Sequence, residues 1–229
     1  MNRYSEITNK NQREIVLLKG HPCIWGKCTF CDYISDNSNN EEEMNKTNIE
    51  VLKNITGKYE VLEVINSGSC FELPKETLIE VKKVIKDKKI KKLFLESHWC
   101  YRNRLKEMEE FFGIPIVFKI GVESFDNDFR NNFLNKNARF NDYKEVKKYF
   151  QSICLMVGIK GQTKEMIKND IDIVLNNFPY GTINIYTENT TKIKRDEELI
   201  KWFEDEYRYL ENNESIEVLF ENTDFGVGD

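Results

Sequence analysis

Three cysteines near the N-terminus are the residues whose types and spacing point most clearly to chemistry. Cys23, Cys28 and Cys31 lie in the run HPCIWGKCTFCDY at residues 21–33. A structural zinc site normally closes its tetrahedron with a fourth Cys or His, whereas an iron–sulfur cluster held by three thiolates leaves one iron free for a small molecule. We therefore expect a metal centre with an open position.

Two other interpretations of the cysteines have to be weighed. A zinc site of three Cys and one His stays open, because His21 lies only two residues before Cys23. Packing of the thiols in a core is disfavoured, since the same stretch carries Gly26, Lys27 and Asp32 and is typical of a loop.

Length and composition limit the classes of function. A chain of 229 residues is long enough for one sizeable core, so we expect a single domain over residues 1–229. The 39 acidic and 34 basic residues give a net charge of −5, which disfavours nucleic acid as a partner and favours a small ligand. No stretch has the apolar length of a membrane span and the N-terminus is polar, so we expect a cytoplasmic protein.

The other three cysteines are scattered along the chain. Cys70, Cys100 and Cys154 each lie at or near the end of an apolar run, and we expect all three to be buried, reduced thiols rather than catalytic groups.

Hydrophobic periodicity predicts short buried strands that alternate with amphipathic helices. The predicted strands are residues 14–18, 61–65, 92–96, 115–121, 152–157 and 182–186, with a last strand at 215–220 that would close one edge. Three predicted helices are recognised by the apolar residues of one face: Met44, Val51, Leu52 and Ile55; Leu78, Val81 and Ile85; and Leu105, Met108 and Phe112. Three later helices are expected to open at Asn141, Thr163 and Arg195. Six βα units indicate an α/β fold with a parallel sheet, a partial (β/α)6 TIM-like barrel.

Polar loops follow the predicted strands. In such folds the ligand lies at the carboxyl ends of the strands. The loops there are the cysteine loop, NSGSC, ESHWC, VESF, GIKGQT and TENTT. They carry Gly, Ser, Asn, Glu and His, which let the backbone approach a ligand or bind it by hydrogen bonds.

These features together resemble the radical S-adenosylmethionine (SAM) enzymes. In that family the cysteine loop follows the first strand and has an aromatic residue just before the third cysteine, the place of Phe30. NSGS (66–69), GVES (121–124) and GIKG (158–161) match the family's cofactor-binding pattern in order, so the resemblance covers nearly the full length. One departure is that four residues, not three, separate Cys23 from Cys28. The resemblance implies a partial barrel of the radical SAM type, with a 4Fe-4S cluster on the three cysteines and SAM on its free iron.

Residue chemistry supports individual cofactor assignments within that resemblance. Gly68, between Ser67 and Ser69, lets carbonyls and hydroxyls approach the ammonium of SAM. Glu123 with Ser124 would accept the ribose hydroxyls, although an ion pair of Glu123 with Lys136 is an alternative.

Backbone at the end of the fifth predicted strand is the candidate adenine contact. Gly158 and Ile159, with Gly161 beyond them, would lie against the ring, although a simple turn predicts the same glycines.

The substrate must be small, because a partial barrel uses nearly the whole chain. The runs CIWGKCTFCDY, LFLESHWCY and GTINIYTENTT resemble those family members that break a carbon–nitrogen bond of queuine, a deazapurine, and release 7-aminomethyl-7-deazaguanine. That likeness implies a flavodoxin or ferredoxin-type electron donor.

Candidate substrate contacts lie at the strand ends and in the C-terminal tail. Glu96 and His98 are the candidate catalytic and substrate-binding groups. Binding of ribose by Glu96 and a structural role for His98 are equal alternatives. Further candidates are Asn66, Tyr186, Glu188, Asn189, Asp224 and Phe225. We expect the strand and tail at 215–229 to cover the barrel mouth, with a disordered tail or a contact in a homodimer as alternatives.

Three competing functions remain open at this point. A 7-carboxy-7-deazaguanine synthase would depend on magnesium, and a glycyl-radical activase would need a protein partner. A zinc or iron–sulfur binding module without enzymatic activity is the third.

Overall fold

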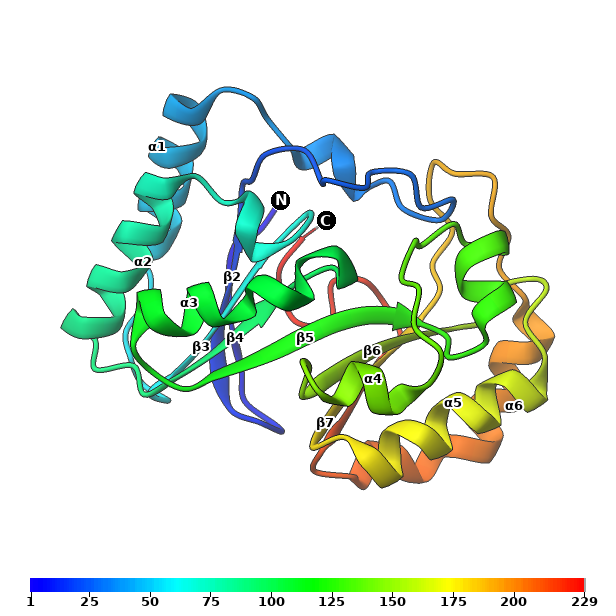
Figure 1. Ribbon diagram of the computed structural model, residues 1–229. Coiled ribbons are helices and arrows are strands. Elements are labelled where there is room, and N and C mark those ends of the chain that lie inside the picture. Colours follow the sequence, from blue (N-terminus) through cyan, green and yellow to red (C-terminus); the bar gives the residue numbers. More distant parts are fainter. Residues whose placement is uncertain (229) are drawn as a thin grey trace. The chain divides into compact units, whose positions relative to one another are not determined.

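The computed structural model describes residues 1–228 and contains a sheet of eight strands (Figure 1). The strands follow one another in the sheet in chain order. They are β1 (Tyr4–Ile7), β2 (Arg13–Leu18), β3 (Val61–Asn66), β4 (Lys92–Glu96), β5 (Ile116–Glu123), β6 (Ser152–Val157), β7 (Tyr180–Ile185) and β8 (Ile216–Leu219). β1 pairs antiparallel with β2, while the pairs from β2 to β4 and from β5 to β8 are parallel. This is the α/β arrangement that the sequence predicts.

The chain divides into two compact units. The first unit comprises residues 1–26, 33–118 and 225–228, and the second comprises residues 27–32 and 119–224. Strand β5 begins in the first unit and ends in the second.

In the first unit, helices pack beside β2. Figure 1 shows α1 (Glu41–Leu52) and α2 (Lys75–Asp87) side by side, and α1 packs against β2. Asn40 starts α1 by accepting a hydrogen bond from the Glu43 amide, as expected for an N-cap. α3 (Leu105–Phe112) ends at Gly113 in the left-handed conformation. Short 3-10 helices cover Tyr33–Asp36, Cys70–Glu72 and Trp99–Arg104.

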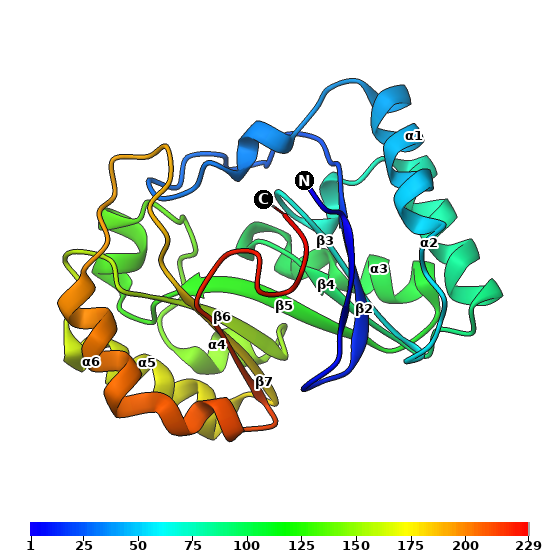
Figure 2. The ribbon, with the colours of Figure 1, turned by 180° about the vertical axis from the view of Figure 1, so that it is seen from behind.

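In the second unit, α5 (Lys164–Asn177) packs on β6 and β7. Figure 2 shows α6 (Glu197–Tyr207) beside α5, where the ammonium groups of Lys164 and Lys168 lie 5.2 and 5.6 Å from the centre of the Trp202 ring. The other elements are α4 (Tyr143–Lys147), a π-helical turn at Phe129–Phe133 and a 3-10 helix at Arg208–Asn212.

Several predicted boundaries differ from those of the structure. The helix expected to open at Asn141 is capped by Asp142, whose carboxylate accepts from the amides of Lys144 and Glu145. The helix expected to open at Arg195 is capped by Asp196 instead. Ile55 lies beyond α1, and the sequence did not predict the partly exposed edge strand β1. Thr163 is confirmed as the N-cap of α5.

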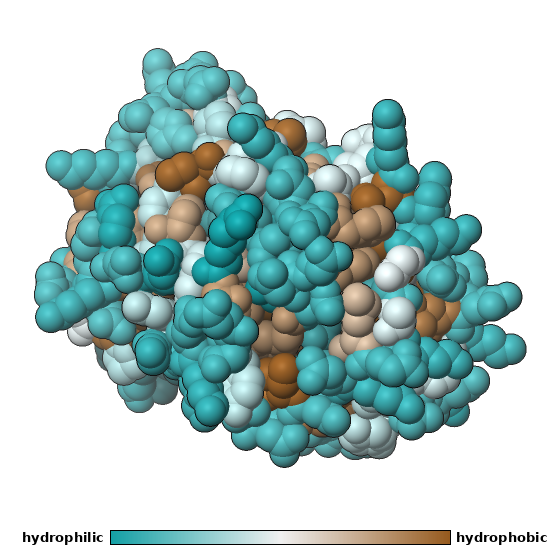
Figure 3. Space-filling view, turned by 45° about the vertical axis from the view of Figure 1, so that its right-hand side comes forward, coloured by the Kyte–Doolittle hydropathy of each residue, from teal (hydrophilic) through white to brown (hydrophobic). Residues whose placement is uncertain are grey.

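The surface is largely polar on the face shown in Figure 3, where hydrophobic residues form small groups between hydrophilic ones. In the described part of the chain, residues 1–228, no helix combines the length and the apolar character that a membrane span needs.

A buried ion pair links β2 to β3 and generates the first prediction. The Arg13 guanidinium donates to Glu63, both side chains are fully buried, and the Phe94 ring lies 5.2 Å from the guanidinium carbon. Glu63→Ala would remove the carboxylate that neutralises this buried cation, and we expect it to lower the free energy of unfolding by about 3–5 kcal/mol.

Urea denaturation measures this loss. The control is Glu50→Ala, which removes an exposed pair with Lys53 and should change stability far less. Equal effects of the two substitutions would show that the buried pair does not stabilise β2 and β3 as described.

Candidate functional site

Cys28 and Cys31 lie on a short segment that the second unit holds by its backbone. The amide of Thr29 donates to the Leu134 carbonyl at 3.0 Å, and its hydroxyl donates to the Phe133 carbonyl at 3.0 Å. On the other side, the side-chain amide of Asn189 donates to the Phe30 carbonyl at 2.7 Å. These bonds fix the position of the segment that carries the two thiols.

An apolar cluster supports the same segment. Both cysteines are partly buried and pack against buried Phe30, Phe129, Leu134, Ile159 and Tyr186. Phe30 is thus a buried anchor between the two thiols.

A buried cation lies next to this thiol pair. Lys136 donates to Glu123 at 2.6 Å, and its ammonium is 5.5 Å from the centre of the Phe30 ring. Burial by itself lowers the pKa of Lys136, but the charges of Glu123, Cys28 and Cys31 outweigh it, so the pKa is raised. The ammonium therefore stays charged beside these two cysteines.

Glu123 is held in an unusual backbone conformation. Its φ is 64°, at a register shift where β5 pairs with β6. A Cβ on Gly121 would lie 2.4 Å from the Glu123 carboxylate and 2.9 Å from the Lys136 ammonium, so a side chain there would displace this ion pair. The ion pair that the sequence left as an alternative is therefore formed. Ser124 is buried, and its hydroxyl accepts from the Asp126 amide at 3.1 Å.

Gln162 shapes the backbone at Gly158 and Ile159. Its side-chain oxygen accepts from both of their amides, at 3.0 and 3.1 Å, and its amide donates to the Met156 carbonyl at 2.7 Å. Gly158 has a φ of 90°, and a Cβ there would collide with Ile200. Sequence reasoning found the glycine and missed Gln162, whose only signal was its place in GIKGQT.

Cys23 belongs to the first unit, where a buried glutamate fixes the residue that follows it. Glu72 accepts from the Ile24 amide at 2.7 Å, and the Glu72 carbonyl accepts from the His21 amide at 2.8 Å. The imidazole of His21 lies 3.2 Å from the Glu41 carboxylate.

The loop Ser67–Ser69 meets the same glutamate. The second carboxylate oxygen of Glu72 accepts from the Ser69 amide, and a Cβ on Gly68 would lie 2.2 Å from that oxygen. Desolvation raises the pKa of Glu72, while its backbone hydrogen bonds oppose the shift. Sequence reasoning missed Glu72, because FELP precedes a helix and carries no motif of its own.

The ends of β3 and β4 are joined through Ser69. The His98 backbone amide donates to the Ser69 hydroxyl at 2.9 Å. The side-chain amide of Asn66 donates to the Ser69 carbonyl at 3.2 Å. His98 Nδ1 accepts from the Cys100 amide at 3.3 Å, so the imidazole also caps a 3-10 helix. Glu96 is partly buried at the end of β4. The structure thus brings Asn66, Ser67–Ser69, Glu96 and His98 together in one unit.

The remaining predicted contacts are engaged within the protein. The Tyr186 ring is buried and its hydroxyl donates to the Ile193 carbonyl at 3.4 Å. Glu188 is exposed and pairs with Lys194 at 3.2 Å. Its pKa is lowered, mainly by the hydrogen bond that it accepts from the Arg195 amide. Asp224 closes a turn by accepting from the Phe220 amide at 2.6 Å.

The Phe225 ring, in the first unit, lies 5.3 Å from the Arg13 guanidinium carbon. The expected placement of residues 215–229 over a barrel mouth stays a prediction.

The other thiols have distinct environments. Cys70 and Cys154 are buried as expected, and desolvation raises the pKa of Cys70. The prediction was wrong for Cys100, which is exposed because it lies on the 3-10 helix that follows β4. Desolvation, followed by the charges of Glu72 and Cys23, raises the pKa of Cys100 to about 11, so this thiol stays protonated.

The donor chemistry fits a thiolate-bound cluster. None of the three cysteines forms a disulfide, and the Lys136 ammonium interacts electrostatically with two of them, Cys28 and Cys31. Within residues 1–228, no three His, Cys, Asp or Glu side chains form a ready-made group for a single metal ion.

Comparison with solved structures gives a full-length match. The chain is 57% identical to queuine lyase from Clostridium spiroforme, solved with SAM and queuine bound; the match covers all of both chains with a TM-score of 0.99. SuiB from Streptococcus suis matches 92% of this chain and 50% of its own at 16% identity, with a TM-score of 0.58. A structure of SuiB bound to S-adenosylmethionine matches at 14% identity and a TM-score of 0.55, covering 92% of this chain and 47% of its own.

The first match confirms the predicted α/β fold of the radical SAM type, and the SuiB matches agree with it at the level of fold. No protein-family model and no curated protein matches the sequence.

The two hydrogen bonds of Glu72 give the prediction for this site. Glu72→Gln keeps one acceptor oxygen, so either the Ile24 or the Ser69 amide must face an NH2 group. We expect amide hydrogen exchange in residues 20–26 or 66–70 to speed up by about tenfold or more, the size of a lost bond to a buried carboxylate.

Hydrogen-exchange mass spectrometry checks this, with Glu107→Gln as control, because that carboxylate pairs with Arg104 on the surface. Unchanged exchange in both segments of Glu72→Gln would contradict the role given to this residue.

Proposed function

We propose that this chain, which belongs to the queuine lyases, a family of radical SAM enzymes, cleaves the carbon–nitrogen bond of queuine and releases 7-aminomethyl-7-deazaguanine. The observation that carries the proposal is the 57% identity over the full length of both chains to an enzyme solved with SAM and queuine bound.

Cys23, Cys28 and Cys31 would hold the 4Fe-4S cluster through three thiolates. The donor set fits, because thiolates are the usual ligands of such clusters and three of them leave one iron open. When bound, the cluster and SAM would supply the radical chemistry that removes a hydrogen atom from the cyclopentenediol of the substrate. The protein's own contribution is to position these groups and to exclude water.

The loop at Ser67–Ser69 would receive the ammonium of SAM. Gly68 keeps this loop open, and Glu72 holds Ser69 in place. Glu123 would accept the ribose hydroxyls, with Ser124 beside it and Lys136 orienting its carboxylate. Backbone at Gly158 and Ile159, fixed by Gln162, would lie against the adenine.

Substrate contacts are proposed at the ends of β4 and β7. Glu96 and His98 would bind the diol or the bridging ammonium and hold a proton there, with Asn66 beside them. Further contacts are proposed at Tyr186, Glu188, Asp224 and Phe225. Because Glu188 already pairs with Lys194, it would have to exchange that partner for the substrate.

The partners and the compartment follow from the same chemistry. A flavodoxin or ferredoxin-type protein would donate the electron, and association into a homodimer is part of the proposal. A cluster held by thiolates requires reduced cysteines, which supports a cytoplasmic location.

An anaerobic assay tests the function. Iron-reconstituted protein is incubated with SAM, dithionite and queuine, and 5'-deoxyadenosine and 7-aminomethyl-7-deazaguanine are followed by mass spectrometry. We expect both products to form together and both to be lost in Cys28→Ala, with Cys154→Ala as a control thiol outside the cysteine loop.

Two results would count against the proposal in different ways. 5'-Deoxyadenosine without the deazaguanine would leave a radical SAM enzyme with a different substrate. Neither product from protein with an intact cluster would refute the reaction itself.

A further inference from the structure

Phe133 exposes its ring beside the cysteine segment of the second unit. In the described part of this unit, residues 27–32 and 119–224, the exposed large hydrophobic side chains are Phe133, 42% exposed, and Tyr209. A single exposed ring is common on protein surfaces, so its position matters more than its exposure.

Both the ring and the backbone of Phe133 contact the parts that hold two of the cysteines. The ring stacks on Phe129 with 5.0 Å between the ring centres, and Phe129 belongs to the buried cluster against which Cys28 and Cys31 pack. The Phe133 carbonyl accepts from the hydroxyl of Thr29, which lies between these cysteines in the chain. The exposed ring is therefore directly connected to the support of the two thiols.

Three backbone segments that carry exposed lysines meet next to Phe133. A Cβ on Gly161 would lie 3.6 Å from the Phe133 ring, so Lys160, one residue earlier, borders the ring. The Lys160 amide donates to the Lys194 carbonyl at 2.8 Å. We define the Phe133 surface by its five exposed residues, which are Lys27, Phe133, Lys160, Lys192 and Lys194.

Lys27 lies on the cysteine segment itself. Its carbonyl accepts from the side-chain amide of Asn135 at 2.7 Å, two residues beyond Phe133. The aromatic ring thus has a lysine on the cysteine segment and others on the loops that follow β6 and β7.

The charge of these segments is opposite in sign to that of the chain. Glu188 already pairs with Lys194 at 3.2 Å, and Asp32 accepts from the amide and the hydroxyl of Thr190, each at 3.0 Å. The whole chain carries a net charge of −5. Six basic and three acidic residues, a net charge of +3, lie in the segments concerned, which are residues 27–32, 128–136, 158–162 and 188–194. Such a surface attracts an acidic partner.

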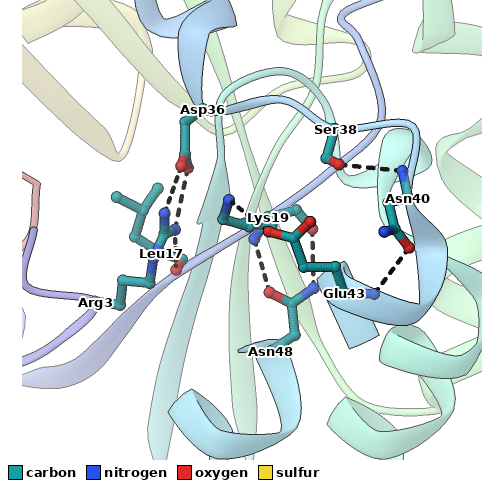
Figure 4. Close-up of polar contacts among 8 residues, drawn as sticks. All are labelled: Arg3, Leu17, Lys19, Asp36, Ser38, Asn40, Glu43 and Asn48. Carbon is teal, nitrogen blue, oxygen red and sulfur yellow. Dashed lines mark hydrogen bonds and ion pairs between the residues drawn. The ribbon is translucent and has the colours of Figure 1, made fainter. Parts of the chain in front are cut away.

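The chain beyond the cysteines carries the other sign. Ile34 is also exposed, on the 3-10 helix of the first unit. Arg3 neutralises Asp36 at the end of that helix (Figure 4). The three glutamates that open α1 are exposed, and the Lys19 ammonium approaches one of them only at 3.8 Å (Figure 4). An acidic partner is therefore disfavoured on this side of the cysteine run.

We propose that the Phe133 surface docks an acidic electron-carrier protein, which passes one electron to the cluster. The carrier is oxidised by one electron and the cluster is reduced by one. The inference rests on the proposed function, which requires this electron. Complexes of redox proteins bury little surface, so one aromatic ring within a rim of charges is of the size that such a complex needs.

Two sources of electrons separate this role from a structural one. Charge complementarity governs the encounter with a protein carrier, whereas dithionite is a small molecule that needs no docking surface. Substitutions on the Phe133 surface should therefore impair reduction by the carrier and spare reduction by dithionite.

Binding of oxidised flavodoxin, an acidic carrier, is measured by biolayer interferometry at low and at high salt. The lysine variant combines Lys160→Glu with Lys192→Glu. The helix variant combines Lys46→Glu with Lys86→Glu, exposed lysines on α1 and α2, and changes the net charge equally. At low salt we expect the Kd to rise at least about fivefold in the lysine variant and in Phe133→Ala, and to stay within about twofold of wild type in the helix variant. High salt should reduce the effect of the lysine variant.

Formation of 5'-deoxyadenosine by cluster-loaded protein is the second readout. The lysine variant should lose at least about fivefold in rate with limiting reduced flavodoxin and keep the wild-type rate with dithionite. For Phe133→Ala the ratio of the two rates is compared, because the ratio cancels any change in the cluster. Ile34→Ala, which shortens an exposed apolar side chain in the first unit, is its control and should leave the ratio unchanged.

Three results would overturn the proposal. The first is flavodoxin binding by the lysine variant within about twofold of wild type, or no binding by the wild-type protein. The second is an equal loss in the helix variant, because it would show a dependence on net charge alone. The third is conversion of a wild-type dimer to a monomer by Phe133→Ala in size-exclusion chromatography, because a second copy of the chain would then cover the surface. The proposed function fails separately, if dithionite yields 5'-deoxyadenosine without the deazaguanine.

Discussion

One buried carboxylate holds two loops of the first unit together. The candidate site residues in this unit depend on both loops. Glu72 accepts the amide of Ile24, next to Cys23, and the amide of Ser69. The Tyr101 hydroxyl donates to the same carboxylate at 3.4 Å. A backbone amide bonded to a buried carboxylate is held more strongly than one bonded to a neutral group. The cysteine and the proposed methionine-binding loop therefore keep a fixed relation to each other, and Gly68 is required because the carboxylate fills the space where a side chain would be.

The second unit fixes its two cysteines through hydrogen bonds to backbone carbonyls and places one cation beside them. Thr29 and Asn189 fix the segment that bears Cys28 and Cys31, and Lys136 lies beside both thiols while it orients Glu123. Thiolates gather negative charge, so a buried ammonium at this place offsets their repulsion. Each unit thus fixes its cysteines through hydrogen bonds to backbone atoms. Backbone atoms are present whichever side chains the neighbouring residues carry.

The sequence predicted the parts of the fold and site that depend on local patterns. Buried strands such as β4 and β6 have the predicted bounds, because continuous apolar runs between turns are a strong signal. Glu72 and Gln162 were not predicted as site residues. The hydrogen bond from Ile24 to Glu72 joins residues far apart in the chain, and no motif marks the turn in which Gln162 binds Gly158, Ile159 and Met156. Asp142 and Asp196 replaced the predicted helix starts because an N-cap carboxylate one residue along competes better for the free amides.

We propose that Cys23, Cys28 and Cys31 hold a cluster with one open iron. Electron paramagnetic resonance of the reduced, iron-reconstituted protein, recorded without and with SAM, tests it most directly. We expect a cluster signal whose shape changes when SAM is added, because SAM would occupy the open position. A signal that SAM leaves unchanged, or a protein that binds zinc and gives no signal, would contradict it.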